Sequence, residues 1–227
     1  MIYIGIDDTD VIDSRGTGHL GRLIAETLAK DFKVTGVTRH QLLFDPRIPY
    51  TAKNSCAAVH IDAEDSDIPT FAFVVEKILT DNFEEGSDPG LAIASLVPQE
   101  IMEFGKQAKT TVLNQKMARS LAEDHKIFLK GLGGTNDGMI GALAAIGLAA
   151  SGEDGRYIQV GDVRELEGLT EIGQLLNAGI HAVKTLSGDT IPNGLVKTEK
   201  LRPARRGAKV VLYVEKSGDH WLPLKID

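Results

Sequence analysis

The chain has 227 residues and a formal net charge of −7, with 42% hydrophobic and 25% charged residues. This balance is typical of a folded protein and argues against disorder. The single cysteine, Cys56, excludes a disulfide within the chain and a zinc site built from several thiolates. The N-terminus lacks a signal-peptide pattern, and no apolar run reaches the roughly 20 residues of a membrane span. We therefore expect a cytoplasmic protein without a membrane partner.

The first hundred residues alternate between the two-residue period of strands and the apolar spacing of helices. They predict, in order, a strand at 2–6, a helix at 17–32, strands at 34–44 and 55–61, a helix at 68–80 and a strand at 91–96. This β-α-β-β-α-β order is the pattern of a ferredoxin-like unit.

The remainder of the chain mixes further helices and strands. It predicts helices from residue 98 and at 114–124, 139–150 and 171–178, and strands at 127–129, 157–160 and 209–215. The predicted fold class is α+β, with two α/β sandwich-like domains, at least one of them ferredoxin-like. We expect these domains to span residues 1–108 and 109–227.

An acidic cluster follows the first predicted strand. Asp7, Asp8 and Asp10 come directly after it, with Asp13 close behind, and Gly16-Thr17-Gly18 then opens a helix. Neighbouring carboxylates repel one another, and a divalent cation relieves that repulsion. Hard oxygen ligands suit Mg²⁺ carrying a nucleotide's phosphates. The alternative is that aspartates simply favour turns and helix caps.

A second candidate segment lies around two prolines, Pro46 and Pro49. Lys53 and Asn54 follow it, and Lys53 is the base that we expect to face a phosphate. The alternative reading is an ordinary proline-rich turn with surface bases. His19 is the histidine nearest to the acidic cluster, and an ordinary surface role is the alternative for it.

A glycine-rich loop, residues 131–138, follows a short predicted strand and opens a helix. In this context backbone amides can bind phosphate. The spacing departs from G-x-G-x-x-G, and close helix packing is the alternative reason for the glycines. The candidates in this loop are Gly133, Gly134, Asn136 and Gly138.

Four segments together resemble the archaeal 2-agmatinylcytidine synthetases, which join agmatine to the wobble cytidine of an isoleucine tRNA with ATP. The family opens with I-G-I-D-D-T-D-S, and residues 4–10 read IGIDDTD. It continues with R-G-M-C-T-T-Y-L, where residues 15–22 read RGTGHLGR. Its proline-containing segment matches LFDPRIPYTAKNSCAAV at residues 43–59. Its G-R-G-L-I-G-A-L-A-A-I-G matches DGMIGALAAIG at residues 137–147.

The resemblance implies a kinase-like domain at 1–108, with Asp7, Asp8 and Asp10 holding magnesium and nucleotide, and a ferredoxin-like domain at 109–227. It implies catalytic roles for Asp7 and Asp8. The family threonine that becomes phosphorylated falls at His19 in the simplest alignment, with Thr17 two residues earlier. Mg²⁺ and ATP are the implied cofactors.

The departures concern the acceptor. The family continues into an OB-fold and a zinc ribbon that handle tRNA, for which this sequence lacks room and thiolates. We therefore expect a small-molecule acceptor rather than tRNA. RNA binding through the basic run at 197–209 stays open, as does association of identical chains.

These observations predict a Mg²⁺-dependent ATP-utilising enzyme, kinase-like or ligase-like. Two alternatives stay open. One is a non-catalytic nucleotide or metabolite sensor, favoured by the lost threonine and bases. The other is a Mg²⁺-dependent phosphatase, because Asp8-Thr9-Asp10 has the D-x-D spacing of the haloacid-dehalogenase phosphatases, although Ile12 departs from that pattern.

Overall fold

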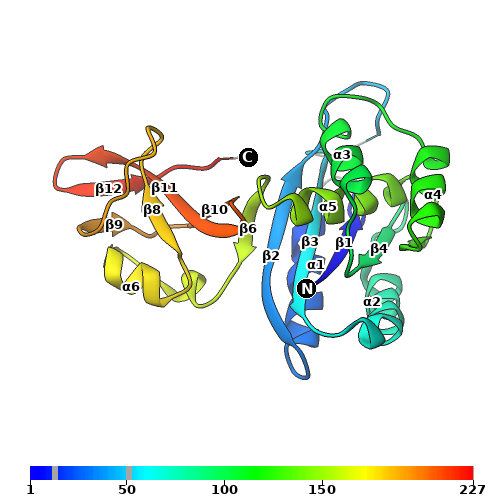
Figure 1. Cartoon of the computed structure of the whole chain (residues 1–227), viewed down its shortest axis with the longest axis horizontal. Coiled ribbons are helices and arrows are strands. Elements are labelled where there is room, and N and C mark those ends of the chain that lie inside the picture. Colours follow the sequence, from blue (N-terminus) through cyan, green and yellow to red (C-terminus); the bar gives the residue numbers. More distant parts are fainter. Residues whose placement is uncertain (12–14, 50–52, 227) are drawn as a thin grey trace.

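The computed structural model describes residues 1–11, 15–49 and 53–226. The fold is α+β, as predicted, and its strands form a 12-stranded mixed sheet. Figure 1 shows two lobes: a larger one that carries α1 to α5, and a smaller one that carries α6 and the last strands. No helix in the described ranges is long and apolar enough to cross a membrane.

The larger lobe contains ten of the main elements. They are β1 (Ile2–Asp7), α1 (Thr17–Leu28), β2 (Lys33–Gln41), β3 (Ser55–Asp62), α2 (Ile68–Asn82), β4 (Gly90–Ala94), α3 (Gln99–Gln107), α4 (Gln115–Asp124), β5 (Phe128–Gly131) and α5 (Gly138–Ser151). The predicted β-α-β-β-α-β order is confirmed for the first six. Strand pairing places them in the order β5-β4-β1-β3-β2, and every pair is antiparallel.

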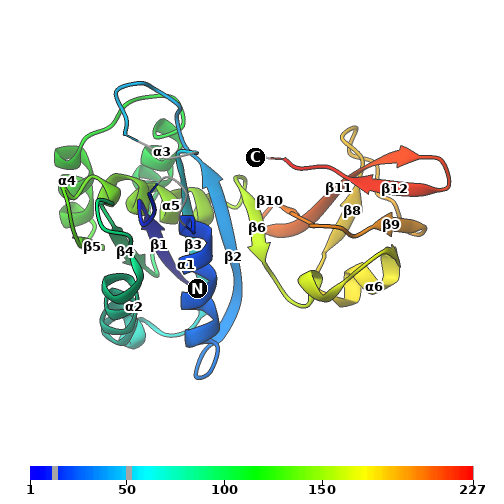
Figure 2. The ribbon, with the colours of Figure 1, turned by 180° about the vertical axis from the view of Figure 1, so that it is seen from behind.

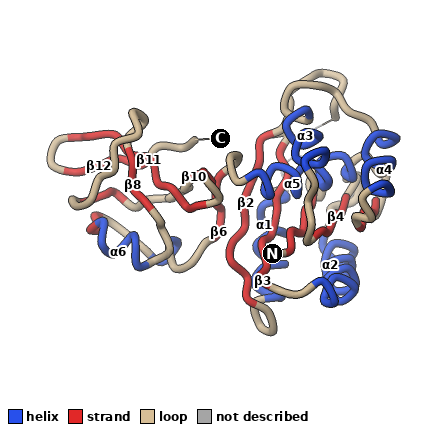
Figure 3. The backbone as a smooth tube through the Cα atoms, viewed as in Figure 1, coloured by secondary structure: helices blue, strands red, loops and turns tan. Residues whose placement is uncertain are grey.

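The smaller lobe is built from short strands. They are β6 (Arg156–Gln159), β7 (Leu169–Glu171), β8 (Ala182–Lys184), β9 (Leu195–Lys197), β10 (Ala204–Arg206), β11 (Lys209–Ser217) and β12 (His220–Pro223), with α6 (Ile172–Asn177) beside them. Only β6 and β11 of these strands were predicted. The strands that were missed have only three or four residues, which is too few to show a clear period. Figure 3 shows how much of this lobe is loop.

Alternation along β1 separates two hydrophobic layers. Ile2, Ile4 and Ile6 are fully buried and belong to the cluster that includes α1 and α2 residues. The intervening positions, Tyr3, Gly5 and Asp7, point to the other face because side chains alternate along a strand. The cluster on that face includes residues of α3, α4 and α5.

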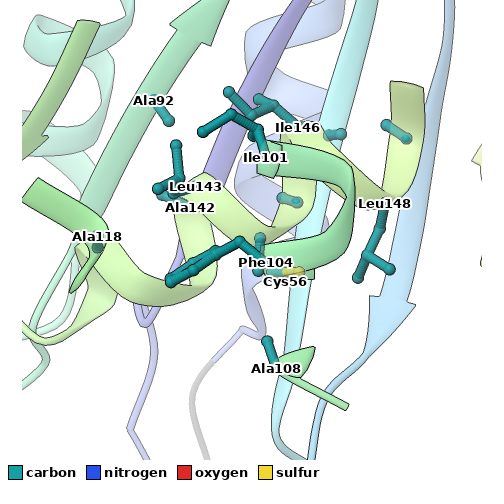
Figure 4. Packing of buried hydrophobic residues seen from close by; sticks show 14 of the residues in the cluster. Cys56, Ala92, Ile101, Phe104, Ala108, Ala118, Ala142, Leu143, Ile146 and Leu148 are labelled. Carbon is teal, nitrogen blue, oxygen red and sulfur yellow. The ribbon is translucent and has the colours of Figure 1, made fainter. Parts of the chain in front are cut away.

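Helix α5 lies unusually close to the sheet because glycines face it. A Cβ at Gly5 would overlap the carbonyl oxygen of Ala142, and one at Gly90 would overlap the backbone of Gly138. Helix α5 also packs closely on α3, because a Cβ at Gly147 would overlap the carbonyl oxygen of Ile101. Figure 4 shows side chains of α3 and α5 within one hydrophobic cluster. Close packing, the alternative reading for the loop glycines, therefore applies at Gly138.

A buried polar network lies where the two lobes join through β2 and β6. Arg205 of β10 donates hydrogen bonds to the Ala149 carbonyl at 2.8 Å and to the Tyr157 hydroxyl at 2.6 Å. Asp154 bonds His40 and forms an ion pair with Lys109. Figure 2 shows the junction from behind. The boundary expected after residue 108 stays a prediction, although α4, β5 and α5 all lie on the larger lobe.

Candidate functional site

A cavity of about 660 Å³ opens at the end of β1, where most of the sequence-predicted candidates meet. Its lining comes from the end of β1, the start of α1, the loop between β2 and β3, the segment from the end of α3 to the start of α4, and the start of α5. The candidates that line it are Asp7, Asp8, Asp10, Thr17, Lys53, Asn54 and Gly138. The candidates His19, Gly133, Gly134 and Asn136 are not among its lining residues.

The position of Asp7 is fixed by strand β1 and by the packing of α5 against it. Asp7 is the last residue of β1, and its carboxylate lies where a side chain at Gly141 would be. Burial first, and then the charges of Asp8 and Asp10, raise the pKa of Asp7 to about 8. A carboxyl with such a pKa holds a proton at neutral pH until a cation replaces it.

Asp8 lies at the turn that follows and has a left-handed backbone conformation, with φ of 51°. Aspartate tolerates this region better than most residues. Burial is the first cause that raises the pKa of Asp8, to about 6, and the charges of Asp88, Asp10 and Asp137 add to it. The acidic cluster therefore includes two residues, Asp88 and Asp137, that no sequence motif indicated.

Asp10 and Thr17 are connected across the loop that contains Asp13, which lies outside the described residues. The hydroxyl of Thr17 donates to Asp10 Oδ1 at 2.9 Å, and the Thr17 amide donates to the same oxygen at 3.3 Å. The side chain of Thr9 donates to the Thr17 hydroxyl at 3.2 Å. Asp10 therefore also serves the α1 N-terminus, as the capping alternative anticipated.

His19 lies in the first turn of α1, where its Nε2 is 3.3 Å from an Arg15 nitrogen. Of the two residues near the family's phosphorylated threonine, Thr17 lines the cavity and His19 does not. The catalytic roles of both stay predictions.

Asp88, two residues before β4, holds the glycine-rich loop at residues 131–138 in place through hydrogen bonds. Its carboxylate accepts a hydrogen bond from the Thr135 amide at 2.7 Å and another from the Thr135 hydroxyl. A Cβ at Gly134 would overlap this carboxylate. The Thr135 amide is therefore engaged within the protein, which gives this part of the loop a structural role beside its predicted phosphate role.

The cavity lining also includes three bases and several apolar residues. Lys53 lies there, while the Asn54 side chain donates to the Leu43 carbonyl at 2.7 Å and holds the loop in place. Thr51, part of the segment that resembles the family, lies outside the described residues. The bases in the lining are Arg47, Lys53 and Lys116, and its larger apolar residues are Leu42, Ile48, Pro49, Val112, Leu113 and Ile140.

The carboxylates can supply hard oxygen ligands for Mg²⁺. Among the described residues no group of three His, Cys, Asp or Glu side chains is close enough to hold a metal by itself. Magnesium usually binds one or two carboxylates and completes its shell with water and phosphate oxygens. The raised pKa values of Asp7 and Asp8 fit such a partial site, because bound positive charge would relieve their repulsion.

Asp88 could have been found from the sequence together with the predicted topology. It comes two residues before β4, and β4 runs antiparallel to β1. The start of β4 therefore lies beside the end of β1, where Asp7 is. The useful signal was an acid immediately before a strand that neighbours the first strand.

Sequence comparison relates the chain to archaeal tRNA-modifying enzymes. It is 30% identical over 156 residues to the tRNA(Ile2) 2-agmatinylcytidine synthetase TiaS of Thermococcus sibiricus, covering 64% of this chain and 35% of that protein. It is 28% identical over 150 residues to TiaS of Cenarchaeum symbiosum, covering 64% and 33%. The chain is a partial relative of TiaS. No protein-family model matches it.

Solved structures support the relation to TiaS. The TiaS–tRNA(Ile2)–ATP complex aligns with a TM-score of 0.57 at 25% identity, over 64% of this chain and 36% of that one. A tRNA fluorescent labelling enzyme aligns with a TM-score of 0.56 at 26% identity, over 64% and 35%. The chain thus spans about a third of the TiaS proteins that it matches.

Proposed function

We propose that this protein is a Mg²⁺-dependent, ATP-utilising phosphotransferase or ligase that acts on a small-molecule acceptor. The observation that carries the proposal is a single cavity whose lining includes Asp7, Asp8 and Asp10 together with Lys53. The relation to TiaS supports ATP as the nucleotide, because a solved TiaS complex contains it.

In this proposal Asp7 and Asp8 hold Mg²⁺, whose charge stabilises the phosphate oxygens during transfer. Lys53 adds positive charge on the far side of the phosphates, and the apolar wall accepts a nucleobase. Asp10 orients the Thr17 hydroxyl and can accept its proton. Thr17 is therefore a better candidate than His19 for a group that carries phosphate.

The first test is Mg²⁺-dependent ATP binding by calorimetry in the double variant Asp7→Asn, Asp8→Asn. We expect at least a roughly tenfold loss of affinity, because each carboxylate supplies a charged ligand. The matched control is Asp81→Asn, which removes a charge on α2 that is paired with Lys77. Normal Mg²⁺-dependent ATP binding in the double variant would contradict the proposal.

A second measurement separates transfer from binding alone. Mass spectrometry after incubation with ATP and Mg²⁺ should find a phosphoryl group on Thr17, and Thr17→Val should abolish it. ATP binding without any turnover or modification would favour a sensor instead. Phosphate release from a general phosphatase substrate, with no need for ATP, would favour the phosphatase alternative.

The acceptor needs its own experiment because the TiaS proteins are named for a tRNA. Our proposal of a small acceptor predicts that total tRNA does not stimulate ATP turnover, whereas a set of small amines and alcohols includes a stimulating compound. Stimulation by tRNA would overturn the acceptor class and leave the ATP site intact.

A further inference from the structure

A group of arginines lies where α1 meets the smaller lobe at β6. Arg22 belongs to α1, Arg164 to the short turn Val163–Glu165 after β6, and Arg202 to the segment before β10. Arg164 and Arg202 line a second cavity of about 580 Å³. This cavity shares no lining residue with the acidic one.

Backbone contacts bring Arg22 into this group. Arg22 donates to the Gly18 carbonyl at 3.0 Å, and Arg164 donates to the Ile158 carbonyl at 3.1 Å. Gly18 and Ile158 are themselves in contact, since a Cβ at Gly18 would lie 3.1 Å from Ile158 Cδ1. Arg22 and Arg164 are therefore anchored on adjoining parts of α1 and β6.

The charges of these arginines act on one another. Burial, followed by the charges of Arg164, Arg156 and Arg22, lowers the pKa of Arg202. Burial and Arg164 also lower the pKa of Arg22, although Glu26 opposes this effect. Gathering partly buried like charges costs free energy, and a bound anion is the usual compensation.

Protein carboxylates offset little of this positive charge. In the described ranges neither Arg22, Arg164 nor Arg202 forms an ion pair with an aspartate or glutamate. Glu167 and Glu199 line the same cavity, but Glu199 lies 3.4 Å from Lys197. The remaining guanidinium N–H groups are therefore available to a ligand.

We propose that Arg164 and Arg202 bind the phosphate group of a small phosphorylated molecule in this cavity, and that the nearby charge of Arg22 strengthens the binding. The planar guanidinium fork matches phosphate oxygens and can bind them through paired hydrogen bonds. A small ligand fits better than a nucleic-acid backbone, because the lining of this cavity of about 580 Å³ includes Glu167 and Glu199, and the chain has a net charge of −7. The bound phosphate would connect α1 with the smaller lobe.

The test is calorimetric titration with inorganic pyrophosphate at constant ionic strength and in EDTA, which removes divalent cations from the acidic cavity. We expect one site per chain in the wild type. The double variant Arg164→Ala, Arg202→Ala should lose affinity at least about tenfold, and Arg164→Lys should lose less. The control Arg119→Ala removes an exposed arginine from α4 and should bind normally.

Thermal melting of each variant without ligand shows whether it is folded, and Arg22→Ala provides an independent removal of charge from the other lobe. Unchanged pyrophosphate binding in the folded double variant would overturn the proposal. If citrate bound as strongly as pyrophosphate, the site would not be specific for phosphate, and the proposal would be overturned. It would also be overturned if a 20-nucleotide RNA bound and pyrophosphate did not. None of these outcomes depends on ATP turnover, so the proposed function is tested separately.

Discussion

At the residue scale, Asp7 shows how the fold changes the chemistry of an ordinary side chain. Strand alternation turns it toward α5, and the absence of a side chain at Gly141 makes room for its carboxylate. Burial and two neighbouring acids then raise its pKa from 3.8 to about 8. Its ionised form is therefore destabilised in the protein without a bound cation.

This shift predicts that Asp7→Asn stabilises the protein at alkaline pH. Between pH 4 and 8 the native Asp7 holds a proton that the unfolded chain releases, so its contribution to stability is full below about pH 4 and lost as the pH rises to 8. In EDTA we expect the variant to melt at least about 3 °C higher than the wild type at pH 8. The difference should vanish near pH 4.

The measurement is thermal unfolding across this pH range, with Asp81→Asn as the control for loss of a carboxylate that is exposed. Equal melting temperatures of the wild type and Asp7→Asn at pH 8 would show that the native site does not oppose ionisation of Asp7.

At the element scale, the close approach of α5 to β1 and β4 positions the site. The helix begins at Gly138, beside the ends of both strands, and it can do so only because Gly5 and Gly90 present no side chains to it. The glycines of β1 and β4 thus determine how near the first turn of α5 comes to the acidic cluster.

We predict that Gly5→Ala is destabilising. Its new methyl group would overlap the carbonyl oxygen of Ala142, so strand and helix must separate at a cost of about 1–3 kcal/mol. The control is Gly173→Ala in α6, where nothing lies within 4 Å of the added carbon. Denaturant unfolding should show a loss for Gly5→Ala and none for Gly173→Ala. Equal stability of the two variants would contradict the packing argument.

At the scale of the whole molecule, buried polar contacts connect the lobes. Arg205 is 5% exposed and joins the end of α5, β6 and β10 through its hydrogen bonds to Ala149 and Tyr157. Its Nη2 also lies 3.4 Å from the hydroxyl of Tyr3 on β1. Truncation of Arg205 would leave the Ala149 carbonyl and the Tyr157 hydroxyl without the guanidinium N–H groups that donate to them.

Arg205→Met is therefore expected to destabilise the protein by about 2–4 kcal/mol and to loosen the junction. Hydrogen exchange should accelerate at the end of α5 and in β6, while the amides of α2 change least. Lys209→Ala, at an exposed position of β11, is the control. Uniform acceleration across both lobes would indicate global destabilisation without a specific loosening of the junction.

The sequence by itself determined the β-α-β-β-α-β order, the strand that ends in Asp7 and Asp8, and the resemblance to TiaS, because periodicity and short motifs are local properties. It did not reveal Asp88 and Asp137, whose charges act on Asp8 only after β1 and β4 pair and α5 packs on them. It also placed His19 and Gly134 with the site, whereas neither lines the cavity. The tertiary structure decided these points, since strand pairing and helix packing bring together residues that are 80 or more positions apart in the chain.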